Sequence, residues 1–142
     1  MAEKKIGNRT FRVKQPLATE ALRLQFRITS LVKDREAFQK IMEAGAEAAS
    51  SKDDNIKAKA GAQVINSVIA VFGSIDPDEG TSLMRDLVAM SEIKASNGQY
   101  ERADIDTEFS EDPSGLFELI GFVMKEVLGP FVAGLLSAMR GK

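Results

Sequence analysis

The C-terminal segment, residues 116–139, is the most apolar stretch of the chain and places the strongest constraint on its fold. Only Glu118, Lys125 and Glu126 interrupt it, and its longest uncharged run covers residues 127–139. A helix that spans a bilayer needs about 20 consecutive apolar residues, so this run is too short. We therefore expect a helix that is buried by its own chain or by a partner, and no membrane association.

On a helical wheel, this segment carries two adjacent apolar stripes rather than one. The stripes consist of Leu116, Ile120, Val123, Val127 and Phe131, and of Phe117, Gly121, Met124, Leu128 and Val132. A surface helix needs a single stripe, so this helix is either a central core helix or one with an extra face for a partner. We place it at residues 113–140, with a kink near residues 129–130 where Gly129 and Pro130 stand.

Phe122 lies on the polar side of the same helix, among the three charged residues. At about 100° per residue it falls about 40° from Glu118 on the wheel, and Leu136 returns to that side. Phe122 is therefore either covered by another element or offered to a partner. The candidate partner-binding residues are Phe109, Leu116, Phe117, Ile120, Phe122, Val123, Val127, Phe131 and Leu136.

Two short segments have the pattern of β-hairpins. Residues 1–15 alternate apolar and basic side chains after a Gly7-Asn8 turn, and residues 91–103 alternate around an Asn97-Gly98 turn. An isolated hairpin is only marginally stable in water. We therefore expect the two hairpins to pair in one small antiparallel sheet.

The region between the hairpins, residues 17–90, has helical periodicity. We expect helices over residues 17–32, 34–49, 56–72 and 77–90, with Ile56 on the inner face of the third. Asp76-Pro77 is a strong helix start, and Asp112-Pro113 repeats it after an acidic loop at residues 104–112. The prediction is a single α+β domain over residues 1–142, predominantly α-helical, with about five or six helices and a small antiparallel sheet from two β-hairpins.

The absence of Cys, His and Trp removes most catalytic chemistries. No thiolate or imidazole is available as a nucleophile, base or zinc ligand. Asp104, Asp106 and Glu108 are spaced like oxygen ligands for calcium, but Phe109 stands where the calcium loop needs glycine. We therefore expect no enzyme activity, no metal and no cofactor.

The charge is distributed unevenly along the chain. Residues 1–27 carry seven basic and two acidic side chains (+5), whereas residues 61–142 carry six basic and thirteen acidic ones (−7). We expect the two ends to neutralise each other within one fold. No basic run is dense enough for a nucleic-acid partner. The charged first five residues do not begin a signal peptide, which predicts a cytoplasmic protein.

Several fragments follow one another in a recognisable order. A hairpin containing FRV is followed by the helix LATEALRLQFRITSLV, then by LMRDLVAM, DIDTEF and GLFELIGFVMKEVLGPF. This order resembles the tail assembly chaperones of long-tailed bacteriophages, over most of the chain.

The resemblance implies a non-enzymatic protein in the cytoplasm of an infected or lysogenic bacterial host. It would bind the helix-rich tape measure protein and keep it soluble during tail-tube assembly. Other tail proteins and a second copy of the chain are further candidate partners. The alternative is a structural tail or tail-completion subunit that is retained in the virion.

Overall fold

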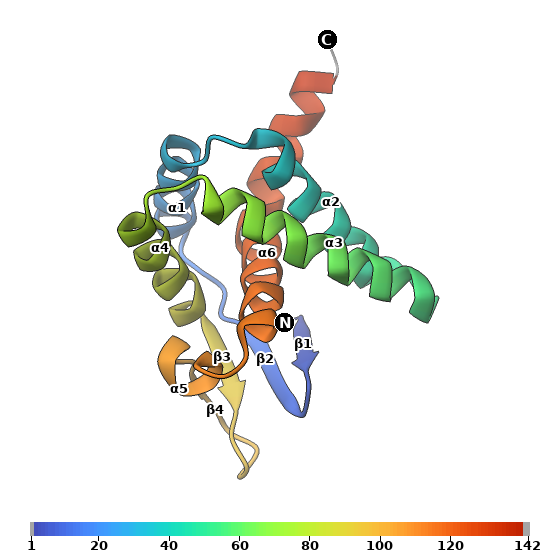
Figure 1. The fold of residues 1–142 in the computed structure, drawn as a ribbon, viewed down its shortest axis with the longest axis vertical. Helices are drawn as coiled ribbons and strands as arrows, with labels where there is room; N and C mark the ends of the chain where they lie inside the picture. The colour runs from blue at the N-terminus through green and yellow to red at the C-terminus, as the bar shows by residue number, and fades with distance from the viewer. Residues whose placement is uncertain (1, 141–142) are drawn as a thin grey trace.

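The computed structural model describes residues 2–140, except for the side chains of Ala46, residues 48–50 and residues 131–140. Within this part of the chain there are six helices and a four-stranded sheet (Figure 1), which confirms a predominantly helical α+β fold. The elements in chain order are β1 (Glu3–Ile6), β2 (Arg9–Val13), α1 (Ala18–Leu31), α2 (Arg35–Ser50), α3 (Asp54–Gly73), α4 (Pro77–Ala89), β3 (Ser91–Lys94), β4 (Tyr100–Arg102), α5 (Ile105–Phe109) and α6 (Pro113–Arg140).

The two hairpins pair through β2 and β3, as predicted. The strand order is β1-β2-β3-β4, every pair is antiparallel, and Phe11 lies opposite Ile93. Gly7 and Gly98 have φ angles of +62° and +86°, so both turns use the left-handed conformation that glycine adopts without steric cost. Each hairpin therefore supplies hydrogen-bond partners for the backbone groups along one edge of the other.

One row across the sheet alternates in charge from edge to edge. Glu3, Arg12, Glu92 and Arg102 are register partners on successive strands. Arg12 Nε donates to Glu92 Oε1 at 2.8 Å, and the Arg12 guanidinium lies 3.8 Å from the centroid of the Tyr100 ring. The Tyr100 hydroxyl donates to the Glu3 carboxylate, and this hydrogen bond raises the pKa of Tyr100.

Ion pairs connect the basic start of the chain to its acidic second half. The pairs are Lys4–Glu118, Arg9–Glu108, Arg9–Asp112, Arg12–Glu92 and Arg27–Asp86. The two ends therefore neutralise each other within one fold, as expected from the distribution of charge.

Helix α6 is the central element of the fold. It contacts the other five helices, β1 and β2, and Figure 1 shows it running through the middle of the molecule. The residues of its two apolar stripes that are completely buried are Ile120, Val123, Met124 and Leu128. The double stripe therefore reflects a helix that is covered from several sides. No helix within the described residues is long and apolar enough to cross a membrane.

The helix starts follow the expected capping chemistry. Asp76 accepts hydrogen bonds from the backbone N–H groups at the start of α4, and Asp53 caps α3 in the same way. Ile56 was expected on the inner face of this helix, and that prediction is wrong, because 39% of the residue is exposed. It lies in the first turn of α3, at the end of the α2–α3 hairpin that projects from the body of the molecule (Figure 1).

The segment 104–112 is not a loop throughout, which corrects the prediction. It contains the short helix α5, which begins where the Asp104 side chain accepts a hydrogen bond from Thr107 N at 2.9 Å. Asp112 then caps α6 by accepting from Gly115 N at 3.1 Å. Helix α6 includes Pro130 within its length, and the kink near residues 129–130 stays a prediction.

Candidate partner-binding site

The predicted partner-binding residues separate into buried and accessible groups. Phe109, Ile120, Val123 and Val127 are buried in the core. Their contact with a partner stays a prediction that would require the elements covering them to move away. Leu116, Phe117 and Phe122 are only partly buried against the same core. Phe131 and Leu136 lie outside the residues whose side chains the structure describes.

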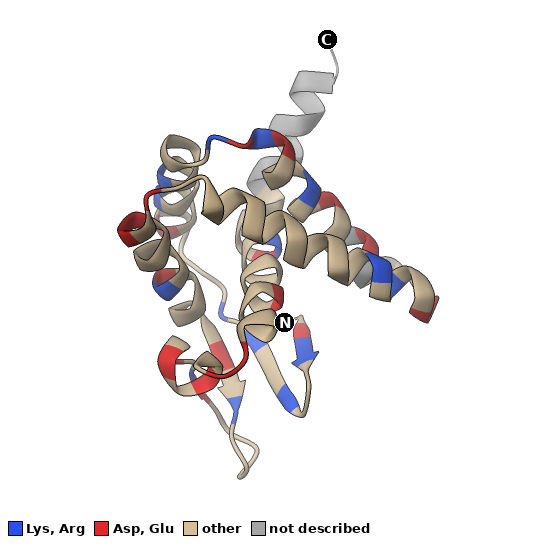
Figure 2. Ribbon diagram, viewed as in Figure 1, with Lys and Arg blue, Asp and Glu red and all other residues tan. Residues whose placement is uncertain are grey.

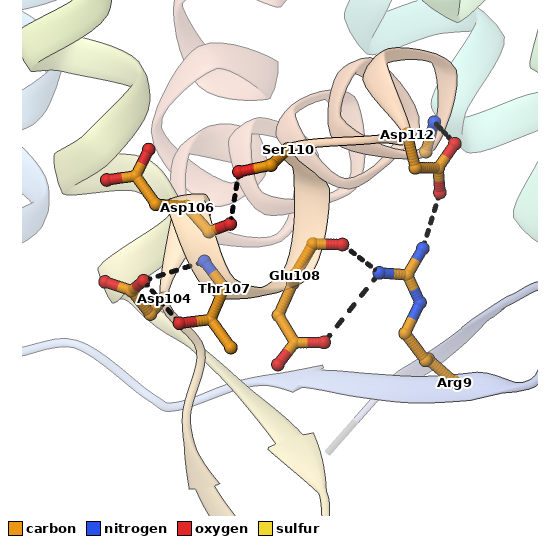
Figure 3. A network of polar contacts seen from close by, with 8 residues as sticks. Arg9, Asp104, Asp106, Thr107, Glu108, Ser110 and Asp112 are labelled. Carbon is orange, nitrogen blue, oxygen red and sulfur yellow. Dashed lines mark hydrogen bonds and ion pairs between the residues drawn. The ribbon is translucent and has the colours of Figure 1, made fainter.

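Phe109 is held in place by the first hairpin. Its ring stacks on Phe11 with centroids 5.7 Å apart, and the Arg9 guanidinium lies 4.8 Å from its centroid. The same guanidinium bonds to Asp112 at 2.5 Å and to the backbone carbonyl of Glu108 (Figure 3). These contacts explain why an aromatic residue in an acidic segment is buried in this structure.

Phe122 lies in a groove of about 480 Å³ that is bounded by four elements. The lining comprises Ala2, Glu3, Lys4 and Lys5 in and before β1, Gly45 of α2, Lys57, Gly61 and Val64 of α3, and Glu118, Gly121, Phe122 and Lys125 of α6. The helical wheel left open whether Phe122 is covered by another element of the chain or accessible to a partner. Phe122 is partly covered by its own chain and partly accessible from a groove.

Two glycines, one on α6 and one on α3, shape this groove. A Cβ atom on Gly121 would lie 2.2 Å from Val64 Cγ1, so α6 and α3 can approach this closely only without a side chain at position 121. A Cβ atom on Gly61 would meet nothing within 4 Å, so that position faces open space. Gly121 therefore allows α6 and α3 to pack closely, and Gly61 leaves the groove open on the α3 side.

The groove carries an excess of positive charge. Lys4, Lys5, Lys57 and Lys125 line it together with two carboxylates, Glu3 and Glu118. Figure 2 shows the basic residues on β1 and near the start of α3.

Two of the four lysines have an ion-pair partner close by. Lys4 Nζ lies 3.4 Å from Glu118 Oε1, and Lys125 Nζ lies 3.0 Å from Glu126 Oε2. Lys5 and Lys57 have no ion-pair partner within the described part of the chain. The site thus combines an aromatic side chain with uncompensated cations, an arrangement suited to binding rather than to proton transfer.

Comparison with known proteins identifies the family. The family model described as phage tail assembly chaperone protein, TAC, matches residues 7–137. This chain belongs to that family. The comparisons with curated proteins and with solved structures gave no match. Membership confirms the resemblance inferred from the order of sequence fragments, and it implies interaction with other tail proteins.

A second groove of the chaperone lies along the α2–α3 hairpin and differs in character. It has a volume of about 570 Å³ and includes the amides of Gln63 and Asn66, but no aromatic residue. Its basic side chains, Lys40 and Lys59, are matched in number by Asp34 and Glu36. It therefore offers neither the apolar anchor nor the charge excess of the Phe122 groove.

The acidic residues considered as cation ligands have separate tasks in the chaperone. Asp104 caps α5, Asp106 pairs with Arg85 at 3.1 Å, and Glu108 pairs with Arg9 at 3.7 Å (Figure 3 draws all of these except Arg85). Among the described residues, no three His, Cys, Asp or Glu side chains lie together as a potential metal site. Asp104 thus stabilises the start of α5, Asp106 joins α5 to α4, and Glu108 joins α5 to the first hairpin.

The lysines and Gly61 of the Phe122 groove were missed by the sequence analysis. Lys5 belongs to β1 and Lys57 to α3, and nothing in the sequence between them indicates that they meet. Only Phe122 carried a local signal, because it is an aromatic residue on the polar side of a helix.

Proposed function

We propose that this tail assembly chaperone binds the phage tape measure protein and keeps it soluble in the host cytoplasm until the tail tube forms. The observation that carries the proposal is the Phe122 groove, because it leaves an aromatic side chain partly accessible in a recess. Membership of the tail assembly chaperone family makes another tail protein the expected partner. Such binding needs no reactive side chain, metal or cofactor, and we propose that the chaperone is not an enzyme.

The position of Phe122 on α6 gives the groove a rigid base. The neighbouring side chains Ile120, Val123 and Met124 are fully buried, so the backbone that carries Phe122 is fixed by core packing. A preorganised site loses little conformational entropy when a partner binds. Many such weak contacts along a long partner chain would add up through avidity.

Leu116, Phe117 and Phe122 are the proposed contact residues in the present conformation. Ile120, Val123 and Val127 would join them only if α6 were uncovered, and Phe109 only if the first hairpin moved away from α5, since all four are buried here. Phe131 and Leu136 are proposed contacts from the part of α6 whose side chains are not described.

Co-expression with the tape measure protein tests this function. We expect the tape measure protein to stay in the supernatant only when the chaperone is present, and Phe122→Ser to reduce that protection while the chaperone stays folded by circular dichroism. Ile69→Ser is the matched control, because Ile69 is an exposed apolar residue on α3 that does not line the groove. Equal precipitation with and without the wild-type chaperone would refute the proposal.

Mass spectrometry of purified particles separates this function from the alternative of a structural tail subunit. A chaperone that leaves before the tail is complete should be absent from the particles. A stoichiometric amount in mature virions would favour the structural role.

A further inference from the structure

We propose that the Phe122 groove selects partner segments in which acidic side chains flank an apolar one. This inference rests on the proposed chaperone function and specifies the chemistry of the segment that the groove accepts. It follows from the apolar surface of the groove, from its charges and from the contrast with the second groove.

The apolar part of the recognition comes from Phe122 and from the space beside it. Phe122 is half-buried, and Val64 borders the same recess. Gly61 leaves the α3 wall without a side chain, with nothing within 4 Å of a Cβ atom placed there. An apolar side chain of a partner can therefore enter between α3 and α6 and lose its contact with water.

The ionic part of the recognition comes from two lysines that have no ion pair with any of the described residues. Lys5 and Lys57 border the recess on β1 and α3, and neither has an ion-pair partner in the described part of the chain. A partner carboxylate near either ammonium group would gain an ion pair. A partner lysine there would face the same charges and be repelled, so the rim discriminates between partners by charge.

The two carboxylates in the lining cancel only part of the positive charge. Glu3 accepts the hydrogen bond of Tyr100, and Glu118 is engaged with Lys4 at 3.4 Å. Lys4 and Lys125 are each offset by a paired carboxylate, Glu118 and Glu126, so the excess positive charge of the recess comes from Lys5 and Lys57. Lys5 and Lys57 outweigh the single remaining carboxylate of Glu3, so the recess keeps a net positive charge and favours an acidic segment.

The second groove provides an internal comparison for this selectivity. It is lined by two lysines and two acidic residues, and it lacks an aromatic side chain. Lys59 of that groove lies two residues from Lys57 on the same helix. The same substitution of lysine by glutamate can therefore be compared in the Phe122 groove, at Lys57, and in the second groove, at Lys59.

Overlapping synthetic peptides that cover the tape measure protein, titrated with the full-length chaperone, test the inference. We expect the bound peptides to contain an apolar residue flanked by Asp or Glu, and their binding to weaken as salt increases. Lys57→Glu should weaken binding of these peptides roughly three- to tenfold, whereas Lys59→Glu should leave it nearly unchanged.

The outcomes separate the inference from the proposed function. If the chaperone protects the tape measure protein but its bound peptides are neutral or basic, the inference is wrong and the function stands. Equal effects of Lys57→Glu and Lys59→Glu would also overturn the inference. If no peptide binds and co-expression gives no protection, both are wrong.

Discussion

Gly121 of α6 lies so close to Val64 of α3 that a Cβ atom at position 121 would be 2.2 Å from Val64 Cγ1. This contact sets the separation of the two helices at the wall of the Phe122 groove. Both residues line the groove, and both are buried, so packing of the core and the shape of the candidate site depend on the same pair. A change at this contact is therefore expected to affect stability and binding together.

Gly121→Ala should destabilise the chaperone, because the added methyl group forces α6 and α3 apart. Such overpacking typically costs about 1–3 kcal/mol of the free energy of unfolding. Urea denaturation followed by circular dichroism measures the change. Gly61→Ala is the control, since its Cβ meets open space and alanine favours a helix over glycine by up to about 1 kcal/mol. A Gly121→Ala variant as stable as the wild type would show that α3 can move without cost.

Gly61→Leu should fill the groove without unfolding the protein. The free energy of unfolding should stay equal or rise, while protection of the co-expressed tape measure protein should fall. Gly73→Leu is the matched control, because a Cβ at position 73 also meets nothing within 4 Å and this residue does not line the groove. Full protection by Gly61→Leu would show that the partner does not enter the recess.

Arg9→Leu should loosen the junction between the first hairpin and the start of α6. The change removes the ion pair with Asp112 at 2.5 Å, the pair with Glu108 at 3.7 Å and the cation–π contact with Phe109. We expect a loss of about 1–3 kcal/mol in the free energy of unfolding, because partly buried acceptors lose their donor. Thermal and urea denaturation both report it.

Arg85→Leu is the control for this prediction. Arg85 pairs with Asp106 at 3.1 Å, but the two side chains are 53% and 73% exposed. An exposed pair of this kind contributes about 0–1 kcal/mol. Similar losses for Arg9→Leu and Arg85→Leu would contradict the structural role given to Arg9.

The start of α5 should weaken in acid. The Thr107 backbone N–H and hydroxyl donate to the Asp104 carboxylate, and the backbone hydrogen bond in particular holds the pKa of Asp104 below its usual 3.8. A depressed pKa stabilises the folded state above pH 3.8, and this contribution is lost as the pH falls through the lower, folded value.

An NMR titration of the Thr107 amide measures this effect. Its chemical shift should change with a midpoint below 3.8, and the change should disappear in Asp104→Ala. A midpoint at or above 3.8 would show that the carboxylate is not held by Thr107.

Local sequence patterns determined most of the secondary structure. The double apolar stripe of α6, the Asp76-Pro77 helix start and the two glycine turns each depend on residues within a few positions of one another. The pairing of the hairpins also followed from the sequence, because each exposes an edge that the other satisfies. The charge difference between the two ends likewise predicted that they would meet.

Only the tertiary structure decided which of these residues are accessible. Phe109 is covered in this structure by Phe11 and Arg9 from the other end of the chain, which its position in an acidic segment did not indicate. Phe122 was an ambiguous residue on a helical wheel until β1 and α3 placed lysines and glycines around it. Helical periodicity predicts which face of a helix is apolar, but not which distant element covers it, because that depends on contacts such as Gly121 with Val64.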